Sequence, residues 1–429
     1  MADLEHLDAL YGAPTPEALY DETYGNYRAF VNPPLARIMK LSGSSVEVRA
    51  RGTTIWDQRG KAYLDFAGGY GVFTLGHSHP RVVAAIREQL ELMSLSSKVM
   101  FNPLLGRVAR ALAQIAPGDL EISFFGNSGT EAVEGAIKLA RAATKRTTIV
   151  STINAYHGKT MGALSATGRD YFRTAFGPLV PDVVHVPFGD VAALDRALEG
   201  AAAFIVEPVQ GEGGVNVSPP GYLRAARELC DKYGALLIAD EVQTGMGRCG
   251  VMFGCDLDGV VPDIMTLAKG LSGGVIPVGA YIARPVVWNA AYSREPLMHT
   301  STFGGNQLAC VAALTAIAIL SEEPIVENAR LRGDQLLAGA RRIADEYPDV
   351  IKEVRGLGLI VGVELRREGY GGAIIPEMLK NGVTAAWMLN MQRVIRLEPP
   401  LIVTEAEVDK ALGALRAGVC TAYGKLGKL

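Results

Sequence analysis

Short apolar segments alternate with longer segments of helical periodicity between residues 121 and 320. The apolar segments predict buried strands, at residues 121–125, 148–152, 203–206, 236–239, 264–267 and 279–283. The longer segments predict helices, at residues 130–144, 222–233 and 306–320. Such alternation is typical of a mostly parallel sheet that is covered by helices on both faces. We therefore expect an α/β fold in this part of the chain.

The N-terminal part of the chain has a different pattern. Residues 46–65 alternate between apolar and polar positions around a turn at Arg59-Gly60, which predicts antiparallel strands. The residues before them contain helical stretches, a break at Pro33-Pro34 and several aromatic side chains. We expect this first segment to be an arm that lies on another surface.

The C-terminal part predicts a smaller α+β unit. A long helical segment after residue 324 is followed by RGLGLIVGVEL, a second helical segment and VIRLEPPLIV. We expect RGLGLIVGVEL to form a tight strand, because its glycines miss the dinucleotide-binding spacing by one residue. The expected domains are an N-terminal arm with part of the small domain at residues 1–70, a large domain at 71–320 and the C-terminal small domain at 321–429.

Composition and charge limit the classes of partner. The chain of 429 residues is 49% hydrophobic and 20% charged, with a formal net charge of −3. No block of Lys and Arg suggests nucleic acid or an anionic membrane, which favours a small solute or a protein partner. The five cysteines form no C-x-x-C pair and the N-terminus lacks the features of a signal peptide, so we expect free thiols and a cytoplasmic protein. The longest nearly apolar segment, residues 308–320, is too short to span a bilayer and predicts a buried helix.

Polar side chains follow five of the predicted strands. Ligands bind at the carboxyl ends of the strands in an open parallel sheet, so these side chains are expected to form one site. They are Asn127-Ser128-Gly129-Thr130, Tyr156-His157-Gly158-Lys159, Glu207 with Gln210 and Glu212, Asp240 with Gln243, and Lys269.

Each of these groups has a chemical and a structural interpretation. Asn-Ser-Gly-Thr at a helix start offers backbone N–H groups and hydroxyls to a phosphate, or is an ordinary cap assisted by Glu131. Lys269 beside apolar walls is a nucleophile toward carbonyl groups, or is a solvated loop lysine. Asp240 keeps a ring nitrogen protonated, or holds a turn. The chemical interpretations together fit pyridoxal phosphate (PLP), with Tyr156 stacked on its ring and Gln243 bonded to its hydroxyl.

Six motifs occur in the same order as in one known family. They are NSGTEAVEGAIKLAR, NAYHGKTMGALSATG, EPVQGEGG, ADEVQTGMGR, LAKGLSGG and HTSTFGGNQLAC. The chain resembles class III aminotransferases of PLP fold type I from about residue 30 to the C-terminus. The resemblance implies a large domain with a mostly parallel, seven-stranded type of sheet and a smaller α+β C-terminal domain. It also implies a homodimer with active sites at the interface, and a dimer of dimers stays open.

The resemblance also implies roles for individual residues. Lys269 is the lysine that forms a Schiff base with PLP, and Asp240 pairs with the pyridine nitrogen; both are the expected catalytic residues. The other expected cofactor-binding residues are Ser128, Gly129 and Thr130 at the phosphate, Tyr156 and His157 at the ring, Glu207 and Gln243 on the ring hydroxyl side, and Thr302 at the phosphate of the neighbouring subunit's cofactor.

The substrate-binding residues are carried over in the same way. Arg396 in VIRLEPPL matches the arginine that binds the α-carboxylate in glutamate-using relatives. Glu212 in QGEGG matches the glutamate that neutralises this arginine when an ω-amine enters. The alternative for Arg396 is a surface ion pair. Lys159 stands where ornithine- and acetylornithine-type relatives carry a carboxylate-binding arginine, which favours an amino donor without a carboxylate. Tyr70 and Phe73 in the FAGGYGVF loop are expected to line an apolar pocket wall.

Within the family, several phrases look closest to putrescine (diamine) aminotransferases. They are YHGKTMGALSAT, VPFGD, TGMGR, LMHTSTFGGN and IRLEPPL. The implied function is ping-pong transfer of the terminal amino group of a diamine or other ω-amine to 2-oxoglutarate. The alternatives are an acetylornithine- or ornithine-type aminotransferase, an amine:pyruvate transaminase, an aminomutase, and an idle PLP-fold protein with a regulatory role.

Three smaller expectations concern acids and histidines. His77 and His79 have no further Cys, His or acid cluster around them, so we expect no metal site. Glu241 is expected to point away from the cofactor and stabilise the following loop. Asp240 is expected to lack a compensating charge when PLP is absent, so that loss of PLP lowers stability.

Overall fold

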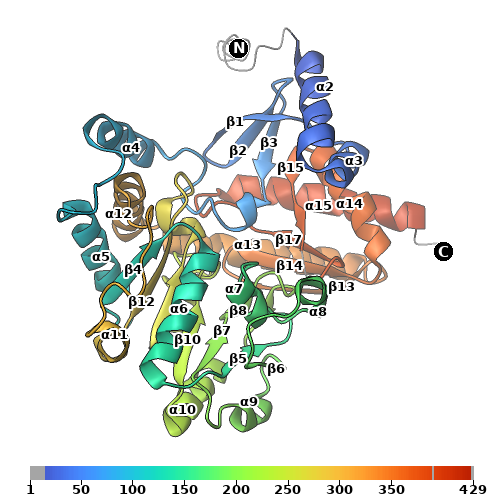
Figure 1. The fold of residues 1–429 in the computed structure, drawn as a ribbon. Coiled ribbons are helices and arrows are strands. Elements are labelled where there is room, and N and C mark those ends of the chain that lie inside the picture. The colour runs from blue at the N-terminus through green and yellow to red at the C-terminus, as the bar shows by residue number, and fades with distance from the viewer. Residues whose placement is uncertain (1–14, 389–390, 427–429) are drawn as a thin grey trace.

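The computed structural model describes residues 15–388 and 391–426, and its largest sheet is the seven-stranded one at the bottom of Figure 1. The strands in spatial order are β4 (Ile122–Gly126), β12 (Gly279–Ala283), β11 (Ile264–Leu267), β10 (Leu236–Asp240), β7 (Ala203–Val206), β5 (Ile149–Thr152) and β6 (Val183–Val186). Strand β12 alone runs in the direction opposite to the other six strands, so the expectation of a mostly parallel sheet is confirmed. The sequence analysis did not predict β6, a half-exposed edge strand whose VVHV sequence lacks a continuous apolar run.

Helices cover both faces of this sheet. On one face, α6 (Gly129–Thr144) and α11 (Pro285–Tyr292) pack against side chains such as Ile238 of β10. On the other face, α5 (Pro103–Ile115), α10 (Tyr222–Tyr233) and α12 (Gln307–Glu322) pack against side chains such as Leu237. Because successive side chains of a strand point to opposite faces, Leu237 and Ile238 belong to two separate cores. The three helices expected at residues 130–144, 222–233 and 306–320 are therefore present.

Shorter elements complete the layers around the sheet. They are α4 (Pro80–Leu92), α7 (Met161–Ala166), α8 (Asp170–Arg173), α9 (Val191–Ala197), and the hairpin of β8 (Val209–Gln210) and β9 (Asn216–Val217). Within the described residues, no single helix is apolar and long enough to cross a bilayer, although the bent pair α12 and α13 (Ile325–Glu346) reaches the threshold by length and composition.

The N-terminal segment joins the C-terminal part of the chain through a second sheet. Its elements are α2 (Pro16–Asn26), α3 (Pro33–Leu41), β1 (Glu47–Arg51), β2 (Thr54–Asp57) and β3 (Ala62–Asp65). The three strands are antiparallel, as expected, and β15 (Val383–Thr384) adds to β3 in parallel. The helical conformation is interrupted at Asn32, whose side chain caps α3, and α3 then begins at Pro33. Residues 1–14 of the expected arm lie outside the described residues.

The C-terminal part contains helices packed on an antiparallel sheet. Its elements are α13, β13 (Ile351–Leu357), β14 (Ile360–Leu365), α14 (Glu368–Lys380), β16 (Ala386–Trp387), β17 (Val394–Leu397) and α15 (Glu405–Leu426), with strand order β13-β14-β17-β16. The expectation that RGLGLIVGVEL forms one strand is wrong, since it forms the β13–β14 hairpin. Gly358 at the turn has φ of +53°, and a Cβ there would lie 2.5 Å from the Arg248 carbonyl oxygen.

Candidate active site

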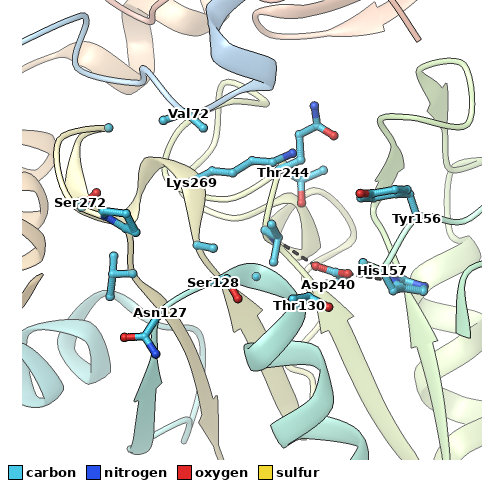
Figure 2. Close-up of a pocket in the computed structure, with 18 of the residues that line it drawn as sticks. Val72, Asn127, Ser128, Thr130, Tyr156, His157, Asp240, Thr244, Lys269 and Ser272 are labelled. Atoms are coloured by element: carbon cyan, nitrogen blue, oxygen red, sulfur yellow. Dashed lines mark hydrogen bonds and ion pairs between the residues drawn. The ribbon is translucent and has the colours of Figure 1, made fainter. Parts of the chain in front are cut away.

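A cavity of about 600 Å³ lies at the carboxyl ends of the parallel strands, where sequence analysis placed the site. Figure 2 shows Lys269 reaching across it, with Ser128 and Thr130 at the start of α6 below and Tyr156 and His157 on the far wall. Asp240 lies between these groups at the end of β10. The cavity therefore brings together residues that follow β4, β5, β10 and β11.

Lys269 follows β11 and begins a short 3₁₀ turn, with a left-handed φ of +42°. Its ammonium is buried, and this burial lowers the pKa of Lys269 despite the nearby carboxylates of Glu398 and Glu212. A lower pKa increases the fraction of neutral amine, which is the nucleophilic form. The alternative of a solvated loop lysine does not fit this position.

Asp240 is held by three donors. The Thr266 hydroxyl and the Val242 amide donate to Oδ1 at 3.0 and 3.1 Å, and His157 Nδ1 lies 2.6 Å from Oδ2. Burial is the largest single influence on His157 and opposes its charge, but the hydrogen bond to Asp240 and the charges of Asp240 and Glu207 together outweigh burial and raise the pKa of His157. The expectation that Asp240 lacks a compensating charge without PLP is therefore wrong, because the protein itself supplies one.

The start of α6 agrees with both interpretations of the Asn-Ser-Gly-Thr motif, a helix cap and a phosphate-binding site. Glu131 N–H donates to the Ser128 hydroxyl at 3.3 Å, and the Glu131 carboxylate accepts from the Asn127 amide at 2.7 Å, so the cap exists. The same turn lines the cavity with Gly129 and Thr130, whose backbone N–H groups lie at the positive end of a 16-residue helix. Such a helix start binds phosphate.

The opposite wall carries Glu207, Tyr156 and Gln243. The Tyr156 amide donates to Glu207 Oε2 at 3.0 Å, and burial raises the pKa of Glu207 to about 8. The Gln243 amide nitrogen donates to both carboxylate oxygens of Glu398 at 3.0 Å.

These residues fit PLP on observations of this structure alone. The cavity holds a helix start for a phosphate, a fixed buried carboxylate for a protonated ring nitrogen, and a buried lysine for an aldehyde. His157 Nε2 is also buried without a hydrogen-bond partner among the described residues, so a polar group can still be accommodated beside it.

Comparison with known proteins agrees with this chemistry. The family model "Aminotransferase class-III" matches residues 41–419. The chain is a class III aminotransferase. Class III aminotransferases depend on PLP and act on an amine and a keto acid, so this enzyme uses PLP as its cofactor.

Three relatives illustrate the similarity. The putrescine aminotransferase of Pectobacterium atrosepticum is 44% identical over 411 residues, which cover 92% of this chain and 88% of that protein. The ornithine aminotransferase of Toxoplasma gondii is 33% identical with a TM-score of 0.89, and 98% of each chain is covered. An (S)-enantioselective omega-transaminase of Thermomicrobium roseum is 34% identical with a TM-score of 0.87, covering 94% of this chain and 98% of that chain.

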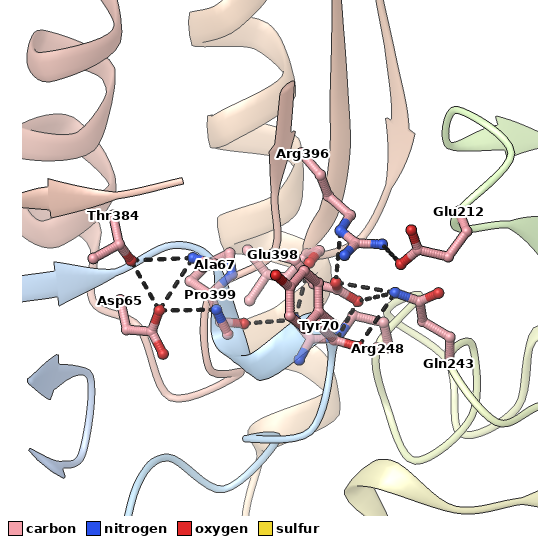
Figure 3. Close-up of polar contacts among 12 residues, drawn as sticks. Asp65, Ala67, Tyr70, Glu212, Gln243, Arg248, Thr384, Arg396, Glu398 and Pro399 are labelled. Carbon is pink, nitrogen blue, oxygen red and sulfur yellow. Dashed lines mark hydrogen bonds and ion pairs between the residues drawn. The ribbon is translucent and has the colours of Figure 1, made fainter. Parts of the chain in front are cut away.

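The aminotransferase buries Arg396 completely, which excludes the alternative of a surface ion pair. Arg396 Nη1 donates to Glu212 Oε1 at 2.6 Å, and the Tyr70 ring centroid lies 5.3 Å from the guanidinium carbon (Figure 3). Arg396, Glu212 and Tyr70 lie beside the cavity. Gln243, which lines the cavity, connects them to it, because its side-chain amide contacts the Tyr70 carbonyl oxygen at 3.4 Å. The structure thus brings the expected carboxylate-binding pair next to the cofactor cavity.

Two other expected residues, Phe73 and Thr302, lie outside the wall of this cavity. Phe73 packs on the ring of His77, 3.8 Å away between centroids, and His77 in turn pairs with Asp65 at 2.8 Å. Thr302 is exposed on the segment between α11 and α12. Lys159 does line the cavity, with its ammonium 4.5 Å from the ring centroid of Phe172.

Sequence analysis missed two buried charges beside this site. Glu398 is fully buried and contacts Gln243, Arg396 and Arg248. Arg248 is also fully buried, and it donates to the Leu359 and Pro399 carbonyl oxygens at 2.9 and 2.5 Å. An acid at the end of an apolar strand had already pointed to Asp240, and the same signal in VIRLEPPL marks Glu398.

Glu241 faces away from the cavity, as expected. Its carboxylate accepts hydrogen bonds from the Gly254 and Cys255 amides at 2.9 and 2.7 Å and from the Thr244 hydroxyl. It therefore holds the loop that follows β10.

Proposed function

We propose that this aminotransferase moves the terminal amino group of a diamine or other ω-amine to 2-oxoglutarate in a ping-pong sequence. One observation carries the proposal: Arg396 is buried beside the cofactor cavity with its charge already paired by Glu212. Such a pocket tolerates a neutral or cationic substrate end while Glu212 stays in place. It binds a carboxylate when Glu212 turns away.

The residues of the cavity would hold PLP at three points. The N-terminus of α6, with Ser128, Gly129 and Thr130, is the phosphate site. Tyr156 would lie beside the ring, and Asp240 would face the ring nitrogen, since both line the cavity. When bound, PLP supplies an electron sink that stabilises a carbanion at the substrate carbon.

The chain's own residues then control the proton and the charge. Asp240, held by Thr266 and Val242, keeps a negative charge where a protonated ring nitrogen needs one. Lys269, whose pKa is lowered by burial, would take a proton from the substrate carbon as a base and then donate it, as an acid, to the carbon that was the aldehyde carbon of PLP.

Two further observations favour a donor without a carboxylate. Lys159, in place of the arginine found in ornithine-type relatives, directs its ammonium to the Phe172 ring. The 44% identical relative is a putrescine aminotransferase, which agrees with a diamine donor. The main alternative is an ornithine-type donor, which the similarity to the Toxoplasma gondii enzyme favours.

We also propose that two chains form a homodimer with the active sites at the interface. Large apolar side chains are exposed on two nearby surface segments, and they are Val99, Met100, Phe101, Leu297 and Phe303. Contiguous exposed apolar side chains of this size mark interaction surfaces. Thr302 belongs to the second segment, which supports the expectation that it reaches the phosphate of the neighbouring cofactor.

A donor panel tests the proposed substrate. The holoenzyme would be assayed with putrescine, cadaverine, ornithine, N-acetylornithine and a monoamine, each against 2-oxoglutarate and against pyruvate. We expect the highest kcat/KM for a diamine with 2-oxoglutarate. Preference for N-acetylornithine or ornithine, or for pyruvate as the acceptor, would contradict the proposal and favour the corresponding alternative.

A further inference from the structure

Glu398 lies at the centre of a buried group of four charged side chains. Its carboxylate is 3.1 Å from Arg396 Nε and 3.8 Å from Arg248 Nε, and none of these three side chains is exposed. Glu212 is the fourth member, 2.6 Å from Arg396 Nη1. Figure 3 shows Glu398 between the two arginines, with Gln243 and Glu212 on the cavity side.

The glycine-rich loop seals this group from water. The Glu398 amide donates to the Phe66 carbonyl at 2.8 Å. A Cβ on Gly71 would lie 2.6 Å from Glu398 Oε1, and one on Gly68 would lie 1.9 Å from the Glu398 carbonyl oxygen. Glu398 is therefore fixed by the backbone packed over it, whereas Glu212 lies on a different segment of the chain.

The charges of these four side chains balance one for one, and Glu398 and Glu212 also lie near the amine of Lys269, which in the holoenzyme would be bound to the cofactor. Arg248 and Arg396 are matched by Glu398 and Glu212 when Glu212 is in place. When Glu212 turns away, one positive charge is left uncompensated, and one substrate carboxylate restores the balance. Arg396 Nη2 is buried without a hydrogen-bond partner among the described residues, so a donor is available for that carboxylate.

We infer that Glu398 is a specificity-determining residue that, together with Arg248, sets the pocket to exchange one carboxylate, that of Glu212, for one substrate carboxylate. Without the Glu398 charge, the pocket would keep an excess positive charge even with Glu212 in place. It would then repel the cationic end of a diamine and attract carboxylates. This inference rests on the proposed function of Arg396 and Glu212.

The test uses the holoenzyme and glutarate, a dicarboxylate that cannot be transaminated, as the probe. Isothermal titration calorimetry would give its Kd, and steady-state kinetics would give KM for putrescine and for 2-oxoglutarate. We expect Glu398→Gln to bind glutarate about tenfold more tightly and to raise the KM for putrescine by about tenfold, with a smaller change in kcat, because one buried charge is removed. Arg248→Met should change the glutarate Kd in the opposite direction and weaken glutarate binding by about tenfold.

Asp263→Asn is the matched control. Asp263 is likewise a buried carboxylate between two arginines, 2.6 Å from Arg227 and 3.3 Å from Arg284. It lies just before β11 begins, whereas Lys269 follows the other end of that strand. Its replacement should leave the glutarate Kd unchanged, so a tighter Kd in this variant would also overturn the inference.

Arg396→Met distinguishes a failure of the proposed function from a failure of the inference about Glu398. If this variant binds glutarate as well as the wild type does, the proposed role of Arg396 fails. If it loses glutarate binding while Glu398→Gln keeps the wild-type Kd, the inference about Glu398 is overturned and the proposed function stands. An unchanged or tighter glutarate Kd in Arg248→Met overturns the inference as well. Because this variant is expected to weaken glutarate binding, it still tests the inference if Glu398→Gln does not fold.

Discussion

His157 Nδ1 lies 2.6 Å from Asp240 Oδ2, and both side chains are buried at the base of the cofactor cavity. The imidazolium therefore compensates the carboxylate on one side. In the proposed arrangement, the cavity side of Asp240 faces the protonated ring nitrogen of PLP. Asp240 thus has a partner within the protein whether or not PLP is bound.

This pair makes the stability of the apoenzyme depend on His157. Bound PLP should raise the melting temperature, because it binds the folded state. Replacement of His157 by Phe leaves Asp240 without its cationic partner only when PLP is absent, so the difference in melting temperature between holoenzyme and apoenzyme should widen. Differential scanning calorimetry of the four forms checks this, and an unchanged difference would contradict it.

The buried acid Glu207 predicts a pH dependence of apoenzyme stability. Burial raises the pKa of Glu207 from its ordinary value of 4.5 to about 8, so the folded state binds the proton more tightly than the unfolded state. The free energy of unfolding should therefore fall as pH rises from about 4.5 to 8, by on the order of a few kcal/mol. His157, Asp240 and Lys269 all face this carboxylate, and His157, whose pKa is also raised, acts in the same direction above about 6.5.

Glu207→Gln isolates the contribution of that acid. The amide oxygen can still accept from the Tyr156 amide, whereas the titrating proton is gone. Chemical denaturation of the apoenzyme between pH 5 and pH 8 should give a flatter stability profile for the variant. Equal slopes for the variant and the wild type would rule out a raised pKa at this position.

Lys269 should be required for turnover. Lys269→Ala removes the amine that reacts with the cofactor and moves the proton, so kcat should fall by about three orders of magnitude or more. The visible absorbance of the lysine-bound cofactor should also disappear. Lys269→Arg is the matched control, because it keeps a positive charge without a nucleophilic amine; turnover near the wild-type rate in either variant would refute the role of Lys269.

Glu241 should matter for stability alone. Glu241→Gln replaces a carboxylate that accepts three hydrogen bonds in the loop after β10. We expect the free energy of unfolding to fall by about 1–3 kcal/mol, since a buried donor or acceptor loses its partner. The KM values of the folded variant should stay close to those of the wild type, and a large KM change at unchanged stability would contradict this assignment.

Tyr70 should affect carboxylate binding through Arg396. Its ring lies 5.3 Å from the guanidinium carbon and is about half exposed, so the contact should contribute about 0.5–1 kcal/mol. Tyr70→Ala should raise the KM for 2-oxoglutarate several-fold and change donor preference, whereas Tyr70→Phe, which keeps the ring, should not. If Tyr70→Ala leaves both KM values and the preference unchanged, Tyr70 has no part in substrate binding.

The sequence predicted the elements of the main sheet well, because buried parallel strands are continuous apolar segments bounded by turns. The segments at 203–206, 264–267 and 279–283 appear in the structure with those bounds. The edge strand β6 was missed because half-exposed strands lack this signal. The hairpin at RGLGLIVGVEL was read as one strand because Gly358 at its turn is flanked by apolar residues that belong to two strands.

Prediction of the cavity-lining positions agrees with the structure where a polar residue follows an apolar strand, as at Asp240 and Lys269. It failed where a residue acts through partners from distant segments. Glu398 meets Gln243 and Arg248 only after the chain has folded, and these pairs are separated by about 150 residues, as in the hydrogen bond of Gln243 to Glu398. The domain boundaries at residues 70 and 320 and the roles of the individual site residues stay predictions.

Asp240 and Glu241 are neighbours, yet one faces the cofactor cavity and the other holds a loop on the far side. A slip of one residue in the pairing of β10 would exchange them. A longer carboxylate would then enter the cavity, and Asp240 would be left under the loop. The register of a five-residue strand therefore decides which of the two acids faces the cofactor cavity.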